Sequence, residues 1–573
     1  MAAIKYIVSG IIICSYLINP LLVNSQDIQN ARIVDPAVHH EVPDDDYISN
    51  SELNLKKGPA YKDRGSSYFT TQVNVDDEGL NIEGDAANEP SLAVDPTNPD
   101  RMAIGWRQFN TITNNFRQAG YGYTLDGGET WTFPGVIEPG IFRSDPVLGS
   151  DADGNFYYNS LTVDNQDNFW CDVFIIEEGS VDWDEGTFAQ GGDKQWMAID
   201  QTDGIGSGNI YSNWTSYYSI CSPGYFTRST DGGASYEDCE TISGIPFWGT
   251  LDTGPEGELY VAGYSNIVGG FLISKSITAQ DPDAFITWEG YVPVDLGGSI
   301  TSGEGPNPGG LLGQTWVAVD KSDGPHSGNV YMLCSVERDF IGDPLDVMFA
   351  RSSDGGETWS NPIRINDDLS TDNWQWFGTM SVAPNGRIDV VWLDTRDALP
   401  GSYNSSLYYS YSINGGETFS ANERLSESFN PHVGWPQQSK MGDYFHMVSD
   451  ECCAHLAWAN TLNGEQDVYY TQINPWFVGI NDVNRASDIV SISSYPNPTS
   501  GPVSIKYQLI EQVNVKISVY DVYGKLIKEL VNTKQEAGSY SIQFNGSKLS
   551  DGIYYCRIEA GSNNDITKIA VVK

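Results

Sequence analysis

Seven stretches of the sequence each carry a polar or aromatic residue at the same distance before a short turn. These residues are Glu89, Asp145, Lys194, Trp248, Gln314, Phe377 and Tyr444. The set combines carboxylates, an amine, an amide and aromatic rings. This mixture suits a sugar, because aromatic rings bind its apolar faces while hydroxyls pair with carboxylates and amides. The alternative is that these side chains only fill the interior and satisfy one another.

Four further residues are candidates for chemistry beside this set. Asp443 directly precedes Tyr444, so the pair combines an acid/base group with a phenol. Arg107 and Arg143 would orient an acidic sugar, because a guanidinium binds a carboxylate through two hydrogen bonds. We therefore predict Asp443, Tyr444, Arg107 and Arg143 as catalytic residues if the protein is an enzyme.

Repeated strand–turn–strand units must position these residues. The clearest repeat aligns residues 200–211 with residues 320–331, and looser copies follow every ~40–60 residues. Seven units can be counted, and six with one irregular insertion is the alternative. Such spacing, with Gly 59, Tyr 32 and Trp 16, predicts an all-β protein built as a seven-bladed β-propeller over residues 88–475.

A second repeat forms a glycine-rich turn in four of the units. In each copy an Asp or Asn precedes two glycines, and an aromatic residue closes the turn. The acidic or amide side chain can accept backbone N–H groups, while the glycines supply positive φ angles. We assign structural roles to Asp126, Asp231, Asp354 and Asn414.

These turns resemble the Asp-boxes, or BNR repeats, of sialidase-like β-propellers, over roughly residues 88–474. The resemblance implies a turn at the blade edge, away from the ligand. It also implies an arginine cluster for the substrate carboxylate, and a tyrosine nucleophile activated by a glutamate. Arg107 matches one arginine of that pattern, but Asn88 occupies the place of the first arginine. We therefore leave open whether the protein is an enzyme.

The N-terminal region contains two expected segments before the repeats. Residues 1–25 are typical of a secretory signal peptide, with Lys5 before an apolar run. Residues 26–87 are acidic, and we expect either a flexible lead or a strand that closes a later element. An exported protein can keep disulfides. Cys221 and Cys239 are the best pair, and Cys452 and Cys453 could bond to each other or elsewhere.

The composition excludes several partners. The formal net charge is −45, which repels phosphate backbones, so no nucleic acid is expected. No apolar run after the signal approaches the ~20 residues of a membrane span. We expect no metal and no cofactor. Asp151, Asp153 and Asn155 resemble a calcium loop without its distant Glu, so a plain turn is preferred over structural Ca²⁺.

The last segment forms a separate domain. A linker over residues 476–487 precedes alternating strands over residues 488–573, which predict a small Ig-like β-sandwich. Tyr495-Pro-Asn-Pro, residues 520–524 and residues 549–554 resemble the type A sorting domain of the type IX secretion system of Bacteroidota. The resemblance implies export across both membranes, removal of the domain, and release or anchoring at the cell surface.

The sequence is compatible with three functions. The first is binding of an extracellular glycan or protein at the mouth of the central channel. The second is hydrolysis of extracellular glycans by a sialidase-like glycosidase. The third is a structural or adhesion propeller, because a fold by itself does not assign a function.

Overall fold

The computed structural model describes residues 33–36, 45–49, 53, 55–339, 341–475, 490–495, 497, 499–509, 512–521, 525–536, 538–550, 552–560 and 563–573. The expected signal peptide and the whole of the expected linker lie outside these residues. The chain divides into two compact units, Met1–Gly479 and Ile480–Lys573. The regular secondary structure of the described residues is almost entirely β-strand in both units, as expected for an all-β protein.

Seven antiparallel sheets follow one another along the described residues of the first unit. The first contains β5 (Ala86–Val94), β6 (Met102–Phe109), β7 (Arg117–Thr124) and β8 (Thr132–Ile137). The second contains β9 (Ser144–Ser150), β10 (Phe156–Val163), β11 (Phe169–Ile176) and β12 (Thr187–Phe188). The third contains β13 (Trp196–Ile199), β14 (Ile210–Asn213) and β15 (Phe226–Ser229). The fourth contains β16 (Leu251–Thr253), β17 (Leu259–Ser265), β18 (Gly270–Ser276) and β19 (Tyr291–Val294).

Of the remaining three sheets, the seventh includes two strands from the N-terminal segment. The fifth contains β20 (Gly298–Ser299), β23 (Trp316–Val319), β24 (Val330–Arg338), β25 (Asp346–Ser352) and β26 (Ile363–Arg364). The sixth contains β27 (Gln375–Val382), β28 (Ile388–Asp394), β29 (Ser406–Ser412) and β30 (Glu423–Arg424). The seventh contains β2 (Lys62–Arg64), β3 (Tyr68–Gln72), β31 (His446–Ser449), β32 (Ala454–Asn460) and β33 (Asp467–Ile473). Two further two-stranded sheets pair β1 (Lys56–Pro59) with β4 (Leu80–Glu83), and β21 (Ser302–Glu304) with β22 (Asn307–Leu311).

One strand of each sheet faces a common interior. These inner strands are β5, β9, β13, β16, β23, β27 and β31. Each lies beside the inner strands of the preceding and following sheets, and β31 returns to β5. Every residue of β5 is buried, because both faces of the strand are covered by neighbouring sheets. This arrangement brings the starts of all seven inner strands together.

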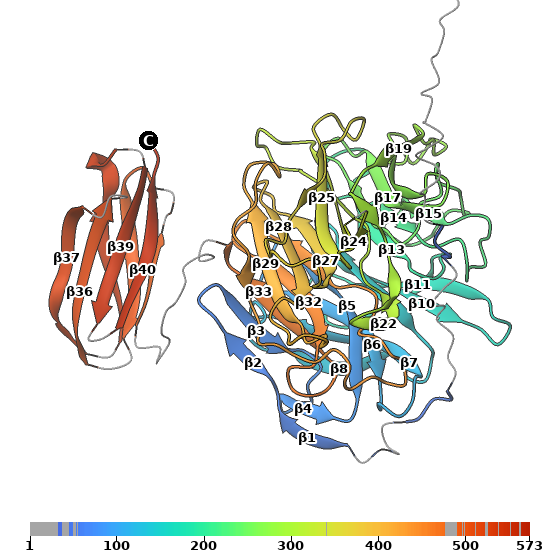
Figure 1. The fold of residues 1–573 in the computed structure, drawn as a ribbon, viewed down its shortest axis with the longest axis horizontal. Coiled ribbons are helices and arrows are strands. Elements are labelled where there is room, and N and C mark those ends of the chain that lie inside the picture. The colour runs from blue at the N-terminus through green and yellow to red at the C-terminus, as the bar shows by residue number, and fades with distance from the viewer. Residues whose placement is uncertain are drawn as a thin grey trace, which may run out of the picture. The chain divides into compact units, whose positions relative to one another are not determined.

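The N-terminal strands complete the seventh sheet. β3 pairs antiparallel with β33, so that Thr70 lies opposite Thr471, and the blue and orange strands run side by side in Figure 1. The hydroxyls of these two threonines are 2.8 Å apart. A strand in the acidic N-terminal segment therefore closes a later element, which is one of the two alternatives for that segment.

Two disulfides are present among the described residues. Cys221 and Cys239 are bonded, which confirms the expected pair. Cys452 and Cys453 are bonded to each other, which selects one of their two alternatives. The remaining described cysteines, Cys171, Cys334 and Cys556, are free and buried.

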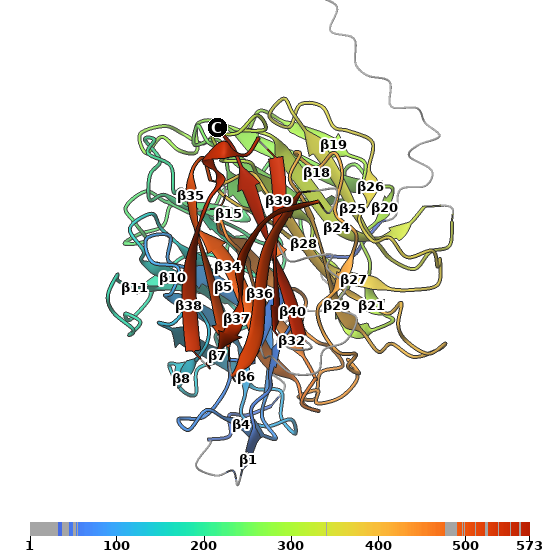
Figure 2. The ribbon, with the colours of Figure 1, turned by 90° about the vertical axis from the view of Figure 1, so that its left-hand side faces the viewer.

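The second unit consists of two sheets around one core. One sheet contains β34 (Val490–Tyr495), β35 (Pro502–Leu509) and β38 (Gly538–Asn545). The other contains β36 (Val513–Asp521), β37 (Leu526–Gln535), β39 (Gly552–Ala560) and β40 (Asn563–Val571), and Figure 2 shows these long strands side by side in red. A short 3-10 helix covers Gly546–Lys548. Val503, Ile517 and Phe544 pack between the sheets.

No helix among the described residues combines the length and the apolar character needed to cross a membrane.

Candidate functional site

Five of the seven residues predicted to face the channel mouth share an unusual backbone. Their φ angles are 51° at Glu89, 48° at Asp145, 58° at Lys194, 51° at Trp248 and 55° at Phe377. In three of the sheets the ladder also shifts register at this point. Left-handed backbone is rare without glycine, and a bulge redirects a side chain at the rim of a sheet. In five of the seven sheets, the repeat therefore aims one side chain towards the start of the channel.

A buried network of opposite charges begins at Glu89. Its Oε2 lies 3.1 Å from Nε of Arg107, and its Oε1 lies 3.3 Å from Nζ of Lys440. Arg107 Nε also donates to Oδ1 of Asn88 at 2.8 Å. Asn88 in turn donates to Gln466 at 2.7 Å. Asn88, which stands where the sialidase resemblance led us to expect an arginine, is thus hydrogen-bonded on both sides within this network.

The network continues through Asp443 to the second and third sheets. Asp443 Oδ2 lies 3.0 Å from Nζ of Lys440 and 2.7 Å from Nζ of Lys194. Lys194 Nζ also lies 3.4 Å from Asp193 and 3.9 Å from Asp145. Three cations therefore face four carboxyl groups. All seven side chains have little or no exposed surface, 4% at most for those of Lys194 and Lys440.

A hairpin and a loop hold this end of the channel closed. Asn307, at the start of β22, donates to the carbonyl of Gly442 at 2.8 Å and accepts from the amide of Met441 at 2.8 Å. The amide of Leu311 donates to Oδ1 of Asp443 at 2.8 Å. The loop that supplies Lys440 and Asp443 is therefore clamped onto the network. Ligand access from this side requires the loop to move.

Burial changes the protonation of the first carboxyl group in the network. Desolvation raises the pKa of Glu89 to about 8, against the opposing effect of Arg107 and Lys440. Glu89 is consequently protonated at neutral pH. Three carboxylates then balance three cations, which explains how so many charges are buried together.

We predict that Glu89→Gln removes a pH dependence of stability. Because the folded-state pKa of Glu89 is raised, its contribution is complete below about pH 4.5 and is lost as the pH rises through about 8. Glutamine mimics the protonated form and does not titrate. The variant should therefore gain free energy of unfolding relative to the unsubstituted chain between these pH values.

Urea unfolding followed by tryptophan fluorescence at several pH values measures this difference. Glu129, which pairs with Arg64 at the surface, gives a control in Glu129→Gln. A constant difference between the Glu89→Gln variant and the unsubstituted chain across the pH range would contradict the assignment.

The other residues that were predicted to line the channel mouth make ring contacts or hydrogen bonds inside the protein. Trp248 stacks edge-on against Phe247 at 5.4 Å between ring centroids, and Phe377 does so against Phe445 at 4.8 Å. The hydroxyl of Tyr444 donates to the carbonyl of Pro146 at 2.7 Å. Gln314 Nε2 donates to the carbonyl of Gly249 at 3.4 Å. Residues of both polar and apolar kinds thus fill this end of the channel.

Arg143 contacts a different set of carboxylates. Its guanidinium lies 2.5 Å from Glu138 and 2.8 Å from Asp172. These carboxylates are different from Glu89, which pairs with Arg107. The two arginines that were expected to orient one acidic sugar therefore hold different partners.

The four glycine-rich turns share one set of contacts. In the first, Asp126 Oδ1 accepts the amide of Thr130 at 2.9 Å and Oδ2 accepts its hydroxyl at 2.6 Å. Asp231 and Asp354 make the corresponding contacts. At Asn414, Oδ1 accepts the amide of Thr418 at 3.0 Å, and Nδ2 donates to the Thr418 hydroxyl at 2.9 Å. Hydrogen bonds from Thr358 and Ser352 lower the pKa of Asp354 to about 2. These contacts are internal to each turn.

The opposite end of the channel holds an open cavity. Its volume is about 920 Å³, and all seven inner strands contribute to its walls. Trp196 and Trp316 lie there with ring centroids 5.0 Å apart. The rim is acidic, with Asp203, Asp252, Glu256 and Asp323 against one lysine, Lys321.

A neutral histidine accompanies the two tryptophans. His446 stacks on Trp316 at 5.9 Å and meets Trp196 edge-on at 5.3 Å. Burial lowers its pKa to about 3. The amide of Leu92 donates to Nδ1 at 3.2 Å, so the proton of the neutral ring is on Nε2. This nitrogen is a hydrogen-bond donor on a residue that lines the cavity.

Sequence reasoning missed Lys440 and the cavity residues. Lys440 lies in the loop before β31, outside the repeated units, so no periodicity identifies it. The signal for Trp196 and Trp316 was present, because they occupy matching positions in the two clearest repeats. His446 follows Tyr444 by two residues and is the first residue of β31.

Several solved structures resemble this chain at low sequence identity. A protein of unknown function from Dyadobacter fermentans is 14% identical with a TM-score of 0.41, covering 72% of this chain and 98% of that one. The α-L-arabinofuranosidase Arb93A of Fusarium graminearum is 10% identical with a TM-score of 0.37, covering 73% and 98%. A Trypanosoma rangeli sialidase is 9% identical with a TM-score of 0.36, covering 89% of each chain. Similarity at this level does not indicate an activity for this protein.

A family comparison identifies the end of the chain. No curated protein matches the sequence. Residues 493–573 match the secretion system C-terminal sorting domain, as the resemblance in this segment implies. A tail of this kind is typical of secreted or cell-surface proteins. The chain therefore ends in a secretion system C-terminal sorting domain, and the protein is secreted or displayed at the cell surface.

Proposed function

We propose that this protein is an exported seven-bladed β-propeller that binds a neutral extracellular glycan in its central channel, after delivery by type IX secretion. The seven sheets support seven blades, because the inner strand of each one takes a place in the same cycle. A six-bladed ring would leave one inner strand outside that cycle. The ligand enters at the ends of the inner strands, opposite the buried charge network.

The cavity of about 920 Å³ at that end carries the proposal. Its size is within the range of small-molecule sites, ~300–1,000 Å³. Trp196 and Trp316 offer aromatic surface for the apolar face of a sugar, and His446 offers a neutral donor for a hydroxyl. The acidic rim repels carboxylated sugars, so sialylated glycans are expected to bind poorly.

We predict that Trp316→Phe weakens glycan binding about ten-fold, which is ~1.4 kcal/mol. The smaller ring loses contact area and the indole donor at the cavity. Trp248→Phe is the matched control, since both tryptophans are buried, with 5% and 2% exposure, at opposite ends of the channel. The test uses the mature protein on an array of neutral and sialylated glycans, followed by titration of the ligands found.

The two variants separate the two possible binding positions. Weaker binding by Trp316→Phe alone supports the open cavity. Weaker binding by Trp248→Phe alone would place the ligand at the start of the inner strands, with Glu89, Asp145, Lys194, Gln314 and Phe377. Absence of any glycan binding would favour a structural or adhesion propeller.

Glycoside hydrolysis at the charge network is a second candidate. The observation that favours it is Glu89, whose raised pKa of about 8 is typical of a general acid. Asp443 belongs to the same network, and Tyr444 is the next residue in the chain. Turnover of fluorogenic glycosides, including a sialoside, that is lost in both Asp443→Asn and Tyr444→Phe would support this candidate. Asn88 disfavours the sialoside.

A further inference from the structure

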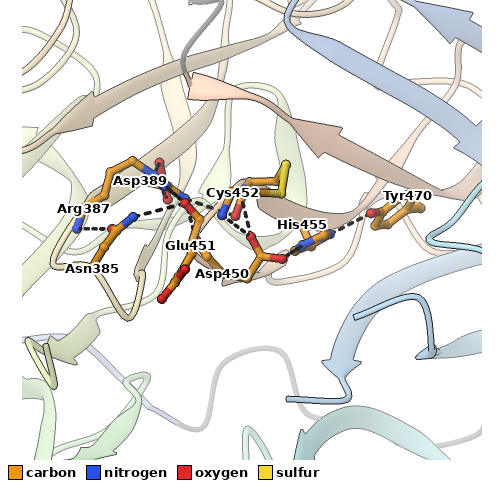
Figure 3. Close-up of a disulfide and its surroundings, with 9 residues drawn as sticks. Asn385, Arg387, Asp389, Asp450, Glu451, Cys452, His455 and Tyr470 are labelled. Atoms are coloured by element: carbon orange, nitrogen blue, oxygen red, sulfur yellow. Dashed lines mark hydrogen bonds and ion pairs between the residues drawn. A yellow bond between two sulfur atoms is a disulfide. The ribbon is translucent and has the colours of Figure 1, made fainter. Parts of the chain in front are cut away.

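The turn between β31 and β32 carries a disulfide between adjacent residues (Figure 3). Cys452 is exposed and Cys453 is buried. The turn follows Ser449, which lines the open cavity of the channel. Neither the glycan site nor the charge network uses this disulfide.

The backbone of this turn is anchored from the neighbouring sheet. The Arg387 guanidinium donates to the carbonyls of Asp450 at 3.0 Å, Glu451 at 3.2 Å and Cys453 at 3.1 Å. Asn385 adds a hydrogen bond to Glu451 at 3.1 Å (Figure 3). The turn therefore has its own support, independent of the bond between the sulfurs.

The carboxylate of Asp450 accepts hydrogen bonds from the backbone of its own turn. Its Oδ1 accepts the amides of Cys452 at 2.8 Å and Cys453 at 2.7 Å. Its Oδ2 lies 3.1 Å from Nε2 of His455, whose Nδ1 lies 2.7 Å from the Tyr470 hydroxyl. The carboxylate is thereby fixed beside the two sulfurs, as Figure 3 shows.

Stabilisation of the fold does not account for this disulfide. A cross-link restricts the unfolded chain more when it closes a longer loop. Cys221 and Cys239 are separated by 18 positions, whereas Cys452 and Cys453 are separated by one. The loop closed by the bond between Cys221 and Cys239 is long enough for that disulfide to stabilise the fold by ~3 kcal/mol. The bond between Cys452 and Cys453 closes the smallest possible loop, and its backbone is already held by Arg387.

The donor atoms of the turn fit a thiophilic metal. The two sulfurs and a carboxylate oxygen of Asp450 all lie within 4.8 Å of one another. Two thiolates and one carboxylate form a ligand set of the Zn²⁺ class, with a fourth position left for water. Only the reduced turn can supply the thiolates.

We propose that Asp450, Cys452 and Cys453 form a redox-gated site for a soft divalent cation. Two molecules of a small thiol supply two electrons and two protons, leave as their own disulfide, and convert the cystine to two thiols. The cation then displaces the two thiol protons and binds both sulfurs and the Asp450 carboxylate. His455 positions that carboxylate. A small-molecule disulfide then accepts two electrons from the two thiolates and two protons from water, and leaves as two thiols. The bond between Cys452 and Cys453 forms again, and the cation is released.

The disulfide-bonded cysteines differ in exposure, and this difference makes reduction selective for the adjacent pair. A thiolate must reach a sulfur to open a disulfide. Cys452 is exposed, whereas Cys221 and Cys239 are half-buried. Limited treatment with glutathione should therefore reduce the adjacent pair first. Alkylation followed by mass spectrometry measures the order of reduction.

The decisive experiment titrates the full mature chain with Cd²⁺, before and after limited reduction and removal of glutathione. The ultraviolet thiolate-to-cadmium absorption band reports binding. We expect about one Cd²⁺ per reduced chain and none per oxidised chain. Cys452→Ser with Cys453→Ser should abolish the band, and Cys221→Ser with Cys239→Ser should preserve it. Intrinsic tryptophan fluorescence verifies that each variant is folded.

Asp450→Asn tests the third ligand. Asparagine keeps an oxygen that accepts the two amides, so the turn is maintained while the charge is lost. We expect Cd²⁺ affinity to fall roughly ten-fold or more. An unchanged affinity would overturn the three-donor site. Equal binding by the reduced chain and the Cys452→Ser, Cys453→Ser variant, or no binding by the reduced chain, would overturn the proposal as a whole.

Discussion

Lys194→Met is expected to lower the free energy of unfolding of the first unit by about 3–5 kcal/mol. Lys194 Nζ lies 2.7 Å from Asp443, 3.4 Å from Asp193 and 3.9 Å from Asp145. Methionine fills a similar volume but brings no charge. The substitution leaves buried carboxylates with too few cations, and water cannot reach them. The cost is therefore mainly their desolvation.

Lys321→Met is the matched control for this prediction. Lys321 Nζ lies 2.5 Å from Asp252, but the two side chains are 38% and 22% exposed. Water screens such a pair, so its loss should cost only about 0–1 kcal/mol. All 16 tryptophans precede residue 477, so tryptophan fluorescence during urea unfolding reports the first unit alone. Equal effects of the two substitutions would show that the Lys194 network is open to water.

Removal of the N-terminal residues through Val75 should prevent stable folding of the first unit. The deletion takes away β3, the partner of β33 in the seventh sheet. It also removes Val73, which is fully buried, and Asn74, which donates to Asp467 at 2.5 Å. A buried branched side chain contributes ~1.5–3 kcal/mol, and the lost backbone pairing adds to that. The sum approaches a domain's total stability of ~5–15 kcal/mol.

The truncated chain exposes β33 as an unpaired edge, so aggregation should accompany the loss of stability. Size-exclusion chromatography and limited proteolysis measure both effects. A chain that begins at Asp45 keeps β1 to β4 and should behave like the longer one. A synthetic peptide of residues 60–75 should partly restore protection from proteolysis. Cooperative unfolding of the truncated chain at undiminished stability would contradict the role of β3 in closure.

The sequence alone determined those features that depend on a few neighbouring residues. The glycine-rich turns at Asp126, Asp231, Asp354 and Asn414 need only an acceptor, two glycines and a hydroxyl within five positions. Repetition of such units predicted the all-β architecture. It also placed Glu89, Asp145 and Lys194 in register, and the structure gives them the same left-handed backbone. The bond between Cys221 and Cys239 followed from their position around one hairpin.

Only the tertiary structure decided which end of the channel is open. The start of each inner strand was visible in the sequence, but the loop carrying Lys440 and the hairpin carrying Asn307 belong to no repeat. These segments meet the inner strands through contacts across more than a hundred positions, such as that between Leu311 and Asp443. A local sequence pattern predicts the direction in which a side chain points. The burial of that side chain depends on distant segments of the chain that pack over it. The same reason explains why the sequence did not show that Trp316 and His446 share one cavity.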